Sequence, residues 1–324
     1  MSSIGLIDVP QDYLQKLFQT EMPWHFQFVF NVVSSPQSSC CAVCIVVMGR
    51  FTDKVVIVTG SSAGIGKAVI LGFAKEGASV VLHGTNTERL AEAEKALHAA
   101  GIPDSRILKI QGYLNEDTVQ DRVINETVAR FGKIDVLVNN AGVYKKPGRS
   151  QNLTENYDYV FAVNVRAVFR LVELATPHLE KTKGNIVNVS SIASFSKPFE
   201  SGTDNGAYGM SKAAIDRFTQ NINQSLMKKG IRINNINPGP FESNILNRSL
   251  GDNATKEQTA AAIKFDSNGL LSFVTSAKRI GDVEELVPAF LLLADEKSSF
   301  ITGSIWVIDG GMSTWAPEAT DLNL

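Results

Sequence analysis

Cysteine is nearly absent from this chain of 324 residues, because all three, Cys40, Cys41 and Cys44, lie in one short stretch near the N-terminus. The 280 residues that follow contain none, so most of the chain can form no disulfide and has no thiol nucleophile. The four histidines show no pairing at the spacing of metal ligands, and we expect no bound metal. This composition suits a reducing compartment, and we expect the protein in the cytoplasm.

The sequence also lacks an excess of charge of either sign. Its formal net charge is -2, with 20% charged and 44% hydrophobic residues. Such a balance gives no electrostatic reason to expect a nucleic acid or an acidic membrane as partner. The composition is that of an ordinary globular protein, and the length allows one large α/β domain or two small ones.

Charged residues are missing altogether between residues 22 and 49. The two apolar runs there, 24–33 and 40–48, are each shorter than the roughly 20 residues that a helix needs to cross a bilayer. The residues before them lack the basic region of a secretory signal. We therefore expect residues 1–49 to be a poorly ordered leader, or an artefact of the gene prediction if translation starts at Met48. Membrane association through an acylated Cys40 or Cys41 is the alternative.

From residue 51 onward, short runs rich in Val and Ile alternate with amphipathic segments. The predicted strands are 55–58, 79–82, 106–110, 134–138, 185–189, 231–236 and 304–307, and helices are predicted at 66–75, 87–100, 117–130 and 207–228. This alternation predicts a parallel sheet with helices on both faces. With right-handed crossovers, it becomes a doubly wound, Rossmann-type fold. We expect one α/β domain of about seven strands over residues 50–315, followed by a tail at 316–324.

A glycine-rich turn follows the first predicted strand, with the sequence TGSSAGIG at residues 59–66. Glycines allow a tight turn and let the backbone approach a pyrophosphate at the positive N-terminus of the next helix. A triphosphate-binding loop does not fit, because Gly60 and Gly66 enclose five residues rather than four and Ala68 follows Lys67 where a hydroxyl is needed. An ordinary strand–helix turn is the structural alternative.

Tyr208 and Lys212 lie four residues apart in a predicted helix, so their side chains share one face. A lysine ammonium beside a phenol favours the phenolate, and we therefore expect the pKa of Tyr208 to fall from about 10 toward working pH. A phenol of this kind can give a proton to a carbonyl oxygen or take one from an alcohol. The alternative is an unremarkable Tyr/Lys pair on a surface helix.

Five features in a fixed order resemble the short-chain dehydrogenase/reductase family over residues 51–312. They are the glycine turn, Asn139-Asn140-Ala141-Gly142 after the fourth strand, Asn164 in a long helix, Ser190-Ser191 after the fifth strand, and Tyr208 with Lys212; Pro238-Gly239 after the sixth strand adds another. Each feature is weak alone, but their order and spacing together are highly specific.

The resemblance implies four catalytic residues. Tyr208 is the proton donor or acceptor at the reacting oxygen, and Ser191 hydrogen-bonds that oxygen. Lys212 holds the nicotinamide ribose and lowers the pKa of Tyr208, while Asn164 anchors a water through which protons reach solvent. Ser191 is preferred over Ser190 because the second serine usually holds the role. Asn164 could instead cap or kink its helix, and the two serines could merely end a strand.

The resemblance further implies a dinucleotide cofactor that carries the hydride. The residues expected to bind it are Gly60, Ser62, Gly64, Ile65, Gly66, Thr85, Asn86, Leu114, Asn139, Ala141, Gly142, Tyr208, Lys212, Pro238, Gly239, Phe241 and Ser243.

The end of the second strand departs from the pattern of NAD-dependent members, which carry an Asp for the ribose 2′-hydroxyl there. This chain has Gly84, followed by Thr85 and Asn86. No carboxylate repels a 2′-phosphate, which favours NADP(H), yet no Arg stands at Thr85 or in the glycine turn, so NAD(H) is possible. Tyr113 occupies the position where an Asp commonly contacts adenine.

Apolar residues dominate segment 241–280, which we expect to cover the substrate. They are Phe241, Ile245, Leu246, Leu250, Phe265, Leu270, Leu271 and Phe273. Such a lining suits a lipophilic ketone, aldehyde or secondary alcohol, although these residues could equally pack the lid on itself. The gap from Ser191 to Tyr208 is longer than usual in the family, and its residues 196–206 could form a loop over the site or a solvated bulge.

The long helices around Asn164 and Lys212 resemble those that pair across subunits, which indicates a homodimer or homotetramer unless Phe169 and Phe218 are core residues. A non-catalytic nucleotide-binding or scaffold protein of the same fold is the competing hypothesis. The intact set of four catalytic residues argues against it, because a binder needs no such set.

Overall fold

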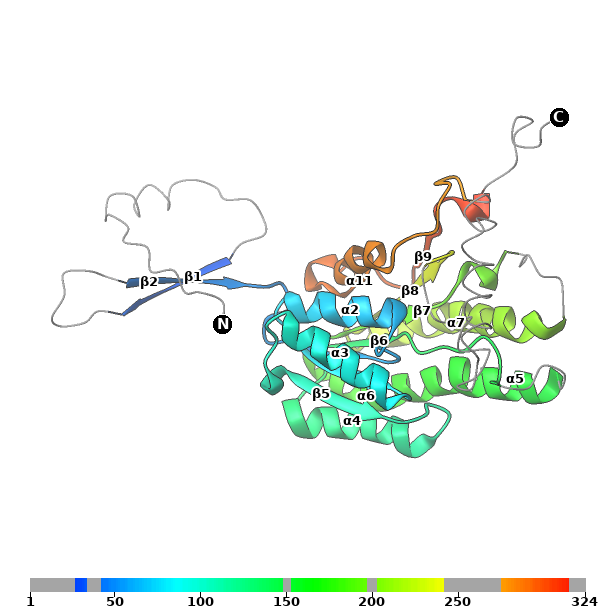
Figure 1. The fold of residues 1–324 in the computed structure, drawn as a ribbon, viewed down its shortest axis with the longest axis horizontal. Helices are drawn as coiled ribbons and strands as arrows, with labels where there is room; N and C mark the ends of the chain where they lie inside the picture. Colours follow the sequence, from blue (N-terminus) through cyan, green and yellow to red (C-terminus); the bar gives the residue numbers. More distant parts are fainter. Residues whose placement is uncertain (1–26, 34–41, 148–152, 197–202, 242–274, 315–324) are drawn as a thin grey trace.

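The computed structural model describes residues 27–33, 42–147, 153–196, 203–241 and 275–314 (Figure 1). The strands are β1 (Gln27–Val33), β2 (Ala42–Met48), β3 (Val55–Val58), β4 (Ser79–Gly84), β5 (Ile107–Gln111), β6 (Val136–Asn139), β7 (Asn185–Val189), β8 (Arg232–Pro238) and β9 (Ile305–Ile308). The longer helices are α2 (Gly64–Lys75), α3 (Thr87–Ala99), α4 (Asp117–Phe131), α5 (Leu153–Phe161), α6 (Ala167–Thr182), α7 (Thr203–Met227) and α11 (Val287–Ala294).

Seven strands form one sheet in the order β5-β4-β3-β6-β7-β8-β9, and every neighbouring pair is parallel. The chain winds outward from β3 to β5, then returns to β6 on the other side of β3. This reversal is the point where open α/β sheets form a crevice at the carboxyl ends of their strands. The predicted doubly wound, Rossmann-type fold is confirmed.

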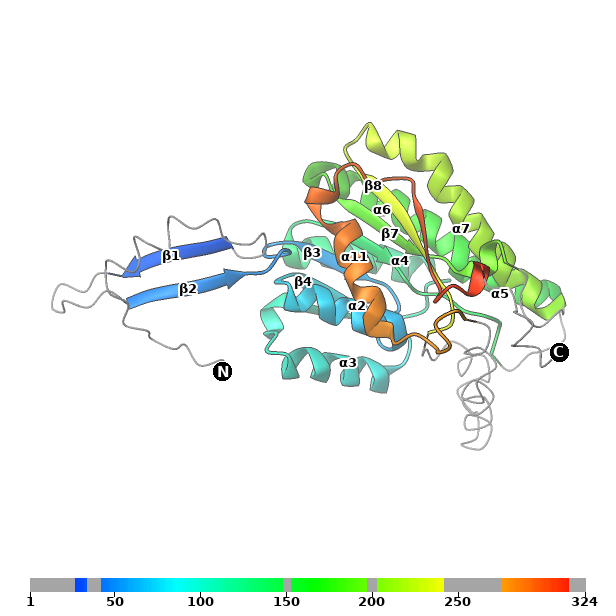
Figure 2. The same cartoon turned by 90° about the horizontal axis from the view of Figure 1, so that it is seen from above.

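Alternate residues of each strand enter opposite hydrophobic layers, as the pleat of a strand requires. On β3, Val56 and Val58 pack in a cluster with Phe73 of α2, whereas Ile57 lies in a second cluster with Leu171 of α6. Helices α2, α3 and α11 cover the first face, and α4, α6 and part of α7 cover the second (Figures 1 and 2). Both faces of the sheet are therefore buried, which explains strands of unbroken Val and Ile.

All seven predicted strands of the sheet are present, with ends that shift by one or two residues. Helix α7 begins at Thr203, four residues before the predicted start. The long helix expected around Asn164 is present as α5, a π-helical segment and α6, whereas α11 was not among the predicted helices. Within residues 1–49, β1 and β2 pair antiparallel, a feature that the lack of charge did not indicate. That residues 1–49 are a poorly ordered leader, or an artefact of the gene prediction, stays a prediction.

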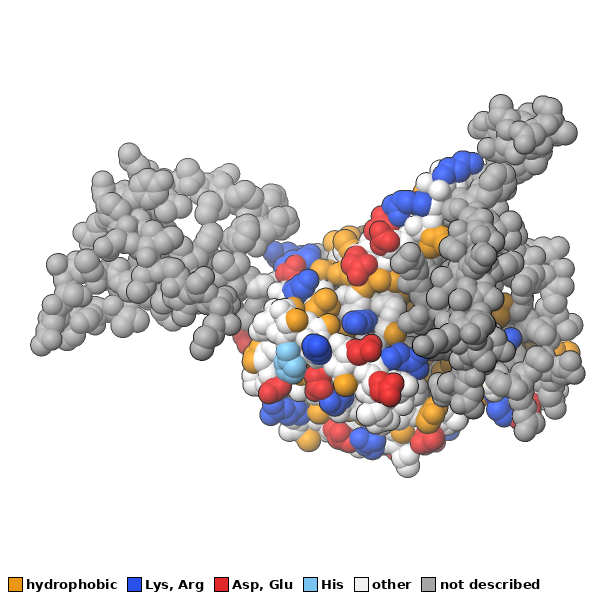
Figure 3. Space-filling model, in the orientation of Figure 1, with side chains coloured by type: hydrophobic (Ala, Val, Ile, Leu, Met, Phe, Trp, Pro, Cys, Tyr) orange, Lys and Arg blue, Asp and Glu red, His pale blue; other side chains and the backbone are white. Residues whose placement is uncertain are grey.

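Charges of both signs are interspersed on the described surface, so no face visible in Figure 3 is dominated by one sign. Among the residues that the structure places, no helix combines the length and apolar character that a membrane crossing requires. In the same part of the chain, no three His, Cys, Asp or Glu side chains converge as they would around a metal ion.

Candidate active site

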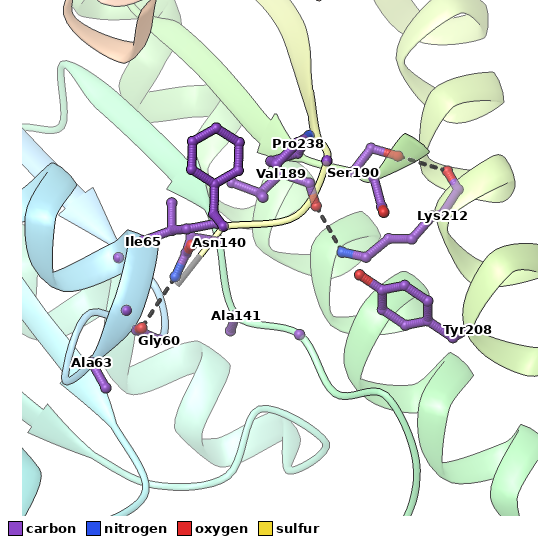
Figure 4. A pocket seen from close by; sticks show the side chains of 16 residues that line it. Gly60, Ala63, Ile65, Asn140, Ala141, Val189, Ser190, Tyr208, Lys212 and Pro238 are labelled. Atoms are coloured by element: carbon purple, nitrogen blue, oxygen red, sulfur yellow. Dashed lines mark hydrogen bonds between the residues drawn. The ribbon is translucent and has the colours of Figure 1, made fainter. Parts of the chain in front are cut away.

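The glycine turn after β3 is joined to the turn after β6 by a set of hydrogen bonds. Thr59 Oγ1 accepts from the backbone nitrogens of Asn140 and Ala141, at 3.0 and 3.1 Å. In return, Asn140 Nδ2 donates to the carbonyl oxygens of Thr59 and Gly60, at 2.8 and 3.1 Å (Figure 4). A Cβ on Gly66 would lie 2.3 Å from Asn140 Nδ2, so this close approach requires glycine.

Two hollows open beside this junction and share Gly60, Ala141 and Gly142. The empty space in them amounts to about 740 and 820 Å³, part of which is open solvent. Together they form one cleft across the carboxyl ends of the strands. The first hollow is lined by the predicted residues Gly60, Gly64, Ile65, Gly66, Ala141, Gly142, Ser191, Tyr208, Lys212, Pro238, Gly239 and Phe241, and the second by Gly60, Ser62, Thr85, Leu114, Ala141 and Gly142.

Three of the predicted residues that the structure describes, Asn86, Asn139 and Asn164, do not line this cleft. Asn86 caps α3 by accepting from the backbone nitrogen of Arg89 at 2.8 Å. Asn139 is buried and donates to Asn188 Oδ1 at 2.8 Å. Asn164 lies beneath the surface, and Ser243 falls outside the described residues, as does nearly all of the predicted substrate-covering segment.

Ser191, Tyr208 and Lys212 converge at one end of the first hollow. Lys212 Nζ donates to the carbonyl oxygen of Val189 at 2.7 Å and lies 5.6 Å from the centre of the Tyr208 ring. The phenol oxygen of Tyr208 points toward the lysine amine in Figure 4, and a hydrogen bond joins it to Ser191. The one-turn spacing therefore brings the two side chains together as predicted.

Burial controls the protonation of both groups. Desolvation raises the pKa of Tyr208 to about 12, and the hydrogen bond with Ser191 opposes this rise. Desolvation lowers the pKa of Lys212 to about 8, and the Asp216 carboxylate opposes that fall. The prediction that Lys212 would lower the pKa of Tyr208 toward working pH is therefore wrong for this structure: desolvation dominates, and the ammonium hydrogen-bonds a carbonyl. At neutral pH Tyr208 is a neutral acid and Lys212 a cation.

The two consecutive serines have different environments. Ser190 is buried, and its hydroxyl donates to the carbonyl oxygen of Lys212 at 3.1 Å. Ser191 Oγ accepts from the backbone nitrogen of Ala193 at 3.1 Å, so its own proton is available for Tyr208 or a ligand. This difference supports the choice of Ser191 as the residue that contacts the substrate.

Asn164 occupies a π-helical segment, Ala162–Arg166, between α5 and α6. Its Oδ1 accepts from the backbone nitrogen of Val143 at 2.8 Å, and its Nδ2 donates to the Val143 carbonyl at 2.9 Å and to Ser211 Oγ at 3.0 Å. The side chain thus joins the loop after β6 to α7, and the irregular helix agrees with the alternative that Asn164 distorts it. Its role in holding a water stays a prediction.

A buried polar network behind the site was not anticipated from the sequence. Asp216 accepts from Asn235 Nδ2 and from Asn237 Nδ2, each at 2.8 Å. Asn237 Nδ2 also lies 3.2 Å from the Ser191 carbonyl oxygen, so the network supports the strand end that carries Ser191. The available signal was Asp216 itself, one helical turn beyond Lys212. Tyr144, whose ring lies 5.1 Å from that of Tyr208, had no such signal.

The sheet order and the glycine turn define a doubly wound α/β protein with a cleft at its switch point, and comparisons with known proteins identify the family. The profile of the short chain dehydrogenases matches residues 54–254. A 3beta-hydroxysteroid dehydrogenase of Mediterraneibacter gnavus is 34% identical over 280 residues, which cover 83% of this chain and 98% of the relative. A gluconate 5-dehydrogenase of Gluconobacter oxydans is 31% identical over 262 residues, 79% of this chain and 93% of the relative.

Solved structures support the same family assignment. A short-chain dehydrogenase/reductase of unknown function from Caenorhabditis elegans, determined with cofactor, has a TM-score of 0.74 and 34% identity and covers 82% of this chain and 97% of its own. A 7 alpha-hydroxysteroid dehydrogenase, complexed with NADH and 7-oxo glycochenodeoxycholic acid, has a TM-score of 0.67 and 27% identity, with coverage of 81% and 95%. The chain therefore belongs to the short-chain dehydrogenase/reductase family of oxidoreductases, as its motifs predicted.

Proposed function

We propose that this protein is an NADP(H)-dependent oxidoreductase that interconverts a ketone or aldehyde with the corresponding alcohol. The observation that carries the proposal is the convergence of Ser191, Tyr208 and Lys212 in a hollow that begins at the glycine turn. The cleft suits a dinucleotide, because the turn at Gly60 and Gly66 presents bare backbone at the N-terminus of α2, where a pyrophosphate would be held.

When bound, the nicotinamide supplies or accepts the hydride. In the reducing direction, Tyr208 donates its proton to the substrate oxygen, and Ser191 stabilises the charge that develops there. Lys212 offsets the negative charge left on the phenol oxygen, because it is a cation within the same buried site. Pro238, Gly239 and Phe241 bound the hollow on the side of β8, where the nicotinamide would lie.

A lipophilic carbonyl compound or secondary alcohol is the proposed substrate class. Tyr144 adds a second aromatic ring beside Tyr208, and the apolar residues of segment 241–280 support the same class. The related proteins are named for substrates as different as a steroid and gluconate, so they favour no single compound.

We further propose a homodimer or homotetramer that works in the cytoplasm. Phe169 of α6 is 55% exposed and packs against Phe218 of α7, which supports an apolar face shared by these two helices. The distribution of cysteine supports a reducing compartment. A purely nucleotide-binding scaffold remains the competing function, and it would not require the Ser191–Tyr208 hydrogen bond.

The deciding experiment replaces Tyr208 with phenylalanine, which keeps the ring and removes the proton. Turnover of carbonyl substrates, followed by the absorbance of NADPH, should fall by about 10²-fold to 10⁴-fold. NADPH binding should be retained. Tyr157→Phe is the matched control, because Tyr157 is 39% exposed on α5 and stacks on Phe161. Equal turnover by the Tyr208 variant and the wild type would exclude the proposed proton transfer.

A further inference from the structure

Asn185, the first residue of β7, has a buried side-chain amide that makes no hydrogen bond within the described residues. The residue is only 2% exposed, and in the part of the chain that the structure describes neither Nδ2 nor Oδ1 has a partner. Its backbone is paired as a strand requires, because the Asn185 nitrogen donates to the Asp135 carbonyl oxygen at 2.9 Å. Buried polar atoms without partners cost stability, so we expect a ligand that both accepts and donates a hydrogen bond.

Asn185 lines a hollow at the amino ends of β6, β7 and β8, with about 410 Å³ of empty space, part of which is open solvent. Its partners in the sheet are Val136 and Arg232, the first residues of β6 and β8, and both also line this hollow. Ser191 follows the other end of β7, and the hollow shares no described lining residue with the two hollows of the cleft. The amino-end hollow is therefore a separate site.

The amino-end hollow contains more positive than negative side chains. Its charged lining residues are Arg50, Lys54, Lys183, Arg232, Asp135 and Glu296. Both carboxylates already have partners. Asp135 accepts from the Val55 backbone nitrogen at 2.8 Å and pairs with Lys133 at 3.2 Å, and Glu296 pairs with Lys54 at 3.1 Å.

Two of the cations interact with backbone oxygens. Lys183 Nζ donates to the carbonyl oxygen of Lys229 at 3.2 Å, and the Arg232 guanidinium donates to three carbonyl oxygens at 2.7–3.1 Å. Arg50, in contrast, pairs with Glu76 at 3.1 Å. Because the positive charges of Lys183 and Arg232 are directed at neutral acceptors, the hollow should attract an anion.

The amide of Asn185 restricts which anion fits. Its Nδ2 donates and its Oδ1 accepts, so a matching anion needs a proton donor as well as acceptor oxygens. Sulfate and acetate offer acceptor oxygens alone at neutral pH and would leave Oδ1 without a partner. Monohydrogen phosphate and a 2-hydroxycarboxylate such as glycolate offer both kinds of group.

We propose that the amino-end hollow binds a small oxyanion that carries its own hydrogen-bond donor, with Asn185 as the residue that recognises both groups. Lys183 and Arg232 supply the positive charge. The site does not depend on the proposed function, because it lies at the opposite end of the sheet from Ser191. A ligand that binds only the folded protein stabilises it, so occupancy should raise the melting temperature.

The test measures binding to the full chain at pH 7 and constant ionic strength by isothermal titration calorimetry. It uses two matched pairs of anions, phosphate with sulfate and glycolate with acetate. In at least one pair, the anion with the donor should bind about tenfold to a hundredfold more tightly, the range of a hydrogen bond to a charged group, and should raise the melting temperature. A preference in one pair alone identifies the ligand as a phosphate or as a hydroxycarboxylate.

Asn185→Leu keeps a similar side-chain volume and should remove the preference while the protein stays folded, because it deletes two polar atoms that have no partner. Lys183→Gln should weaken binding by about threefold to tenfold and keep the preference. Lys181→Gln is the matched control, because it removes an exposed positive charge two residues away that does not line the hollow.

Four results would overturn the inference. Equal affinities within both pairs would indicate an adventitious ion only, and the absence of saturable binding would exclude the site. A preference that persists in Asn185→Leu would place the anion elsewhere, for example at the glycine turn. A much lower melting temperature of Asn185→Leu in the absence of these anions would show that the amide already has partners.

Discussion

The charge of Lys212 depends on Asp216, and this dependence gives a measurable pH effect. Lys212 is buried, and desolvation has already lowered its pKa to about 8, with Asp216 as the group that opposes the fall. Neighbouring side chains one helical turn apart have Cβ atoms separated by ~6 Å. At that separation and an effective dielectric of about 20, two unit charges interact by about 3 kcal/mol, or about 2 pKa units.

The expected effect of Asp216→Asn is smaller than this limit. The Asp216 carboxylate accepts hydrogen bonds from Asn235 and Asn237 of β8. These bonds partly neutralise its negative charge and weaken its interaction with Lys212. We therefore expect the pKa of Lys212 to fall by about one further unit. Because a lysine is a cation below its pKa, the activity that needs this cation should persist below about pH 8 in the wild type and disappear from about pH 7 in the variant.

The assay is the pH profile of kcat/KM for carbonyl reduction, which reports the pKa values of the free enzyme. Tyr208 cannot supply the alkaline limb in this range, since its pKa of about 12 leaves it protonated. Asp216→Asn also disturbs two hydrogen bonds and will lower the melting temperature, but partial unfolding reduces the height of a profile and does not move its limb. Glu173→Gln, which removes an exposed carboxylate from α6, is the control. Identical limbs in the wild type and Asp216→Asn, or a wild-type limb above pH 10, would refute the reasoning.

Three further predictions concern the serines, the glycine turn and the helix face. Ser191→Ala should lower kcat/KM by about 10²-fold to 10³-fold with little loss of stability, whereas Ser190→Ala should cost about 1 kcal/mol in urea unfolding and leave most of the activity. Gly66→Ala should destabilise by about 1–3 kcal/mol and weaken nucleotide binding, while Gly206→Ala, where a Cβ meets no atom within 4 Å in α7, should stabilise by about 0.5–1 kcal/mol in the same denaturation assay. Phe169→Asp should shift the mass measured by light scattering toward the monomer with a retained circular dichroism spectrum.

The sheet could be predicted from the sequence because its strands are buried on both faces. Val56, Ile57 and Val58 must all be apolar, so the strand stands out as an unbroken run between the charged pair Asp53-Lys54 and the glycine turn. The long helix expected around Asn164 is interrupted by the π-helical segment Ala162–Arg166, an irregularity that the sequence pattern did not reveal. The antiparallel pair β1–β2 was not predicted, although both strands are rich in Val, Phe and Ile, because the apolar runs were interpreted only as a leader.

The residues of the candidate site differ in how much of their position and contacts could be predicted from the sequence. Tyr208 and Lys212 were predicted from their spacing of one helical turn together with the order of the other motifs, because the spacing alone also fits an ordinary surface pair. The hydrogen bonds that Asp216 accepts from Asn235 and Asn237 were not anticipated, since they depend on the packing of α7 against β8 and local sequence does not show it. A local motif shows which side chains are neighbours in the chain. How far a side chain is buried, and which distant residues it hydrogen-bonds, depends on the packing of the whole fold.

The protonation of the Tyr208–Lys212 pair shows why spacing alone was insufficient. In water, an ammonium beside a phenol lowers the pKa of the phenol, but both groups here have lost most of their water, and desolvation disfavours the charged form of each. Burial thus keeps the tyrosine neutral and brings the lysine close to losing its proton. A neutral phenol hydrogen-bonded to Ser191 is the form that a carbonyl reduction consumes. In the proposed reduction, Tyr208 would therefore donate its proton at neutral pH, and the phenolate left behind would be stabilised only while Lys212, supported by Asp216, stays charged.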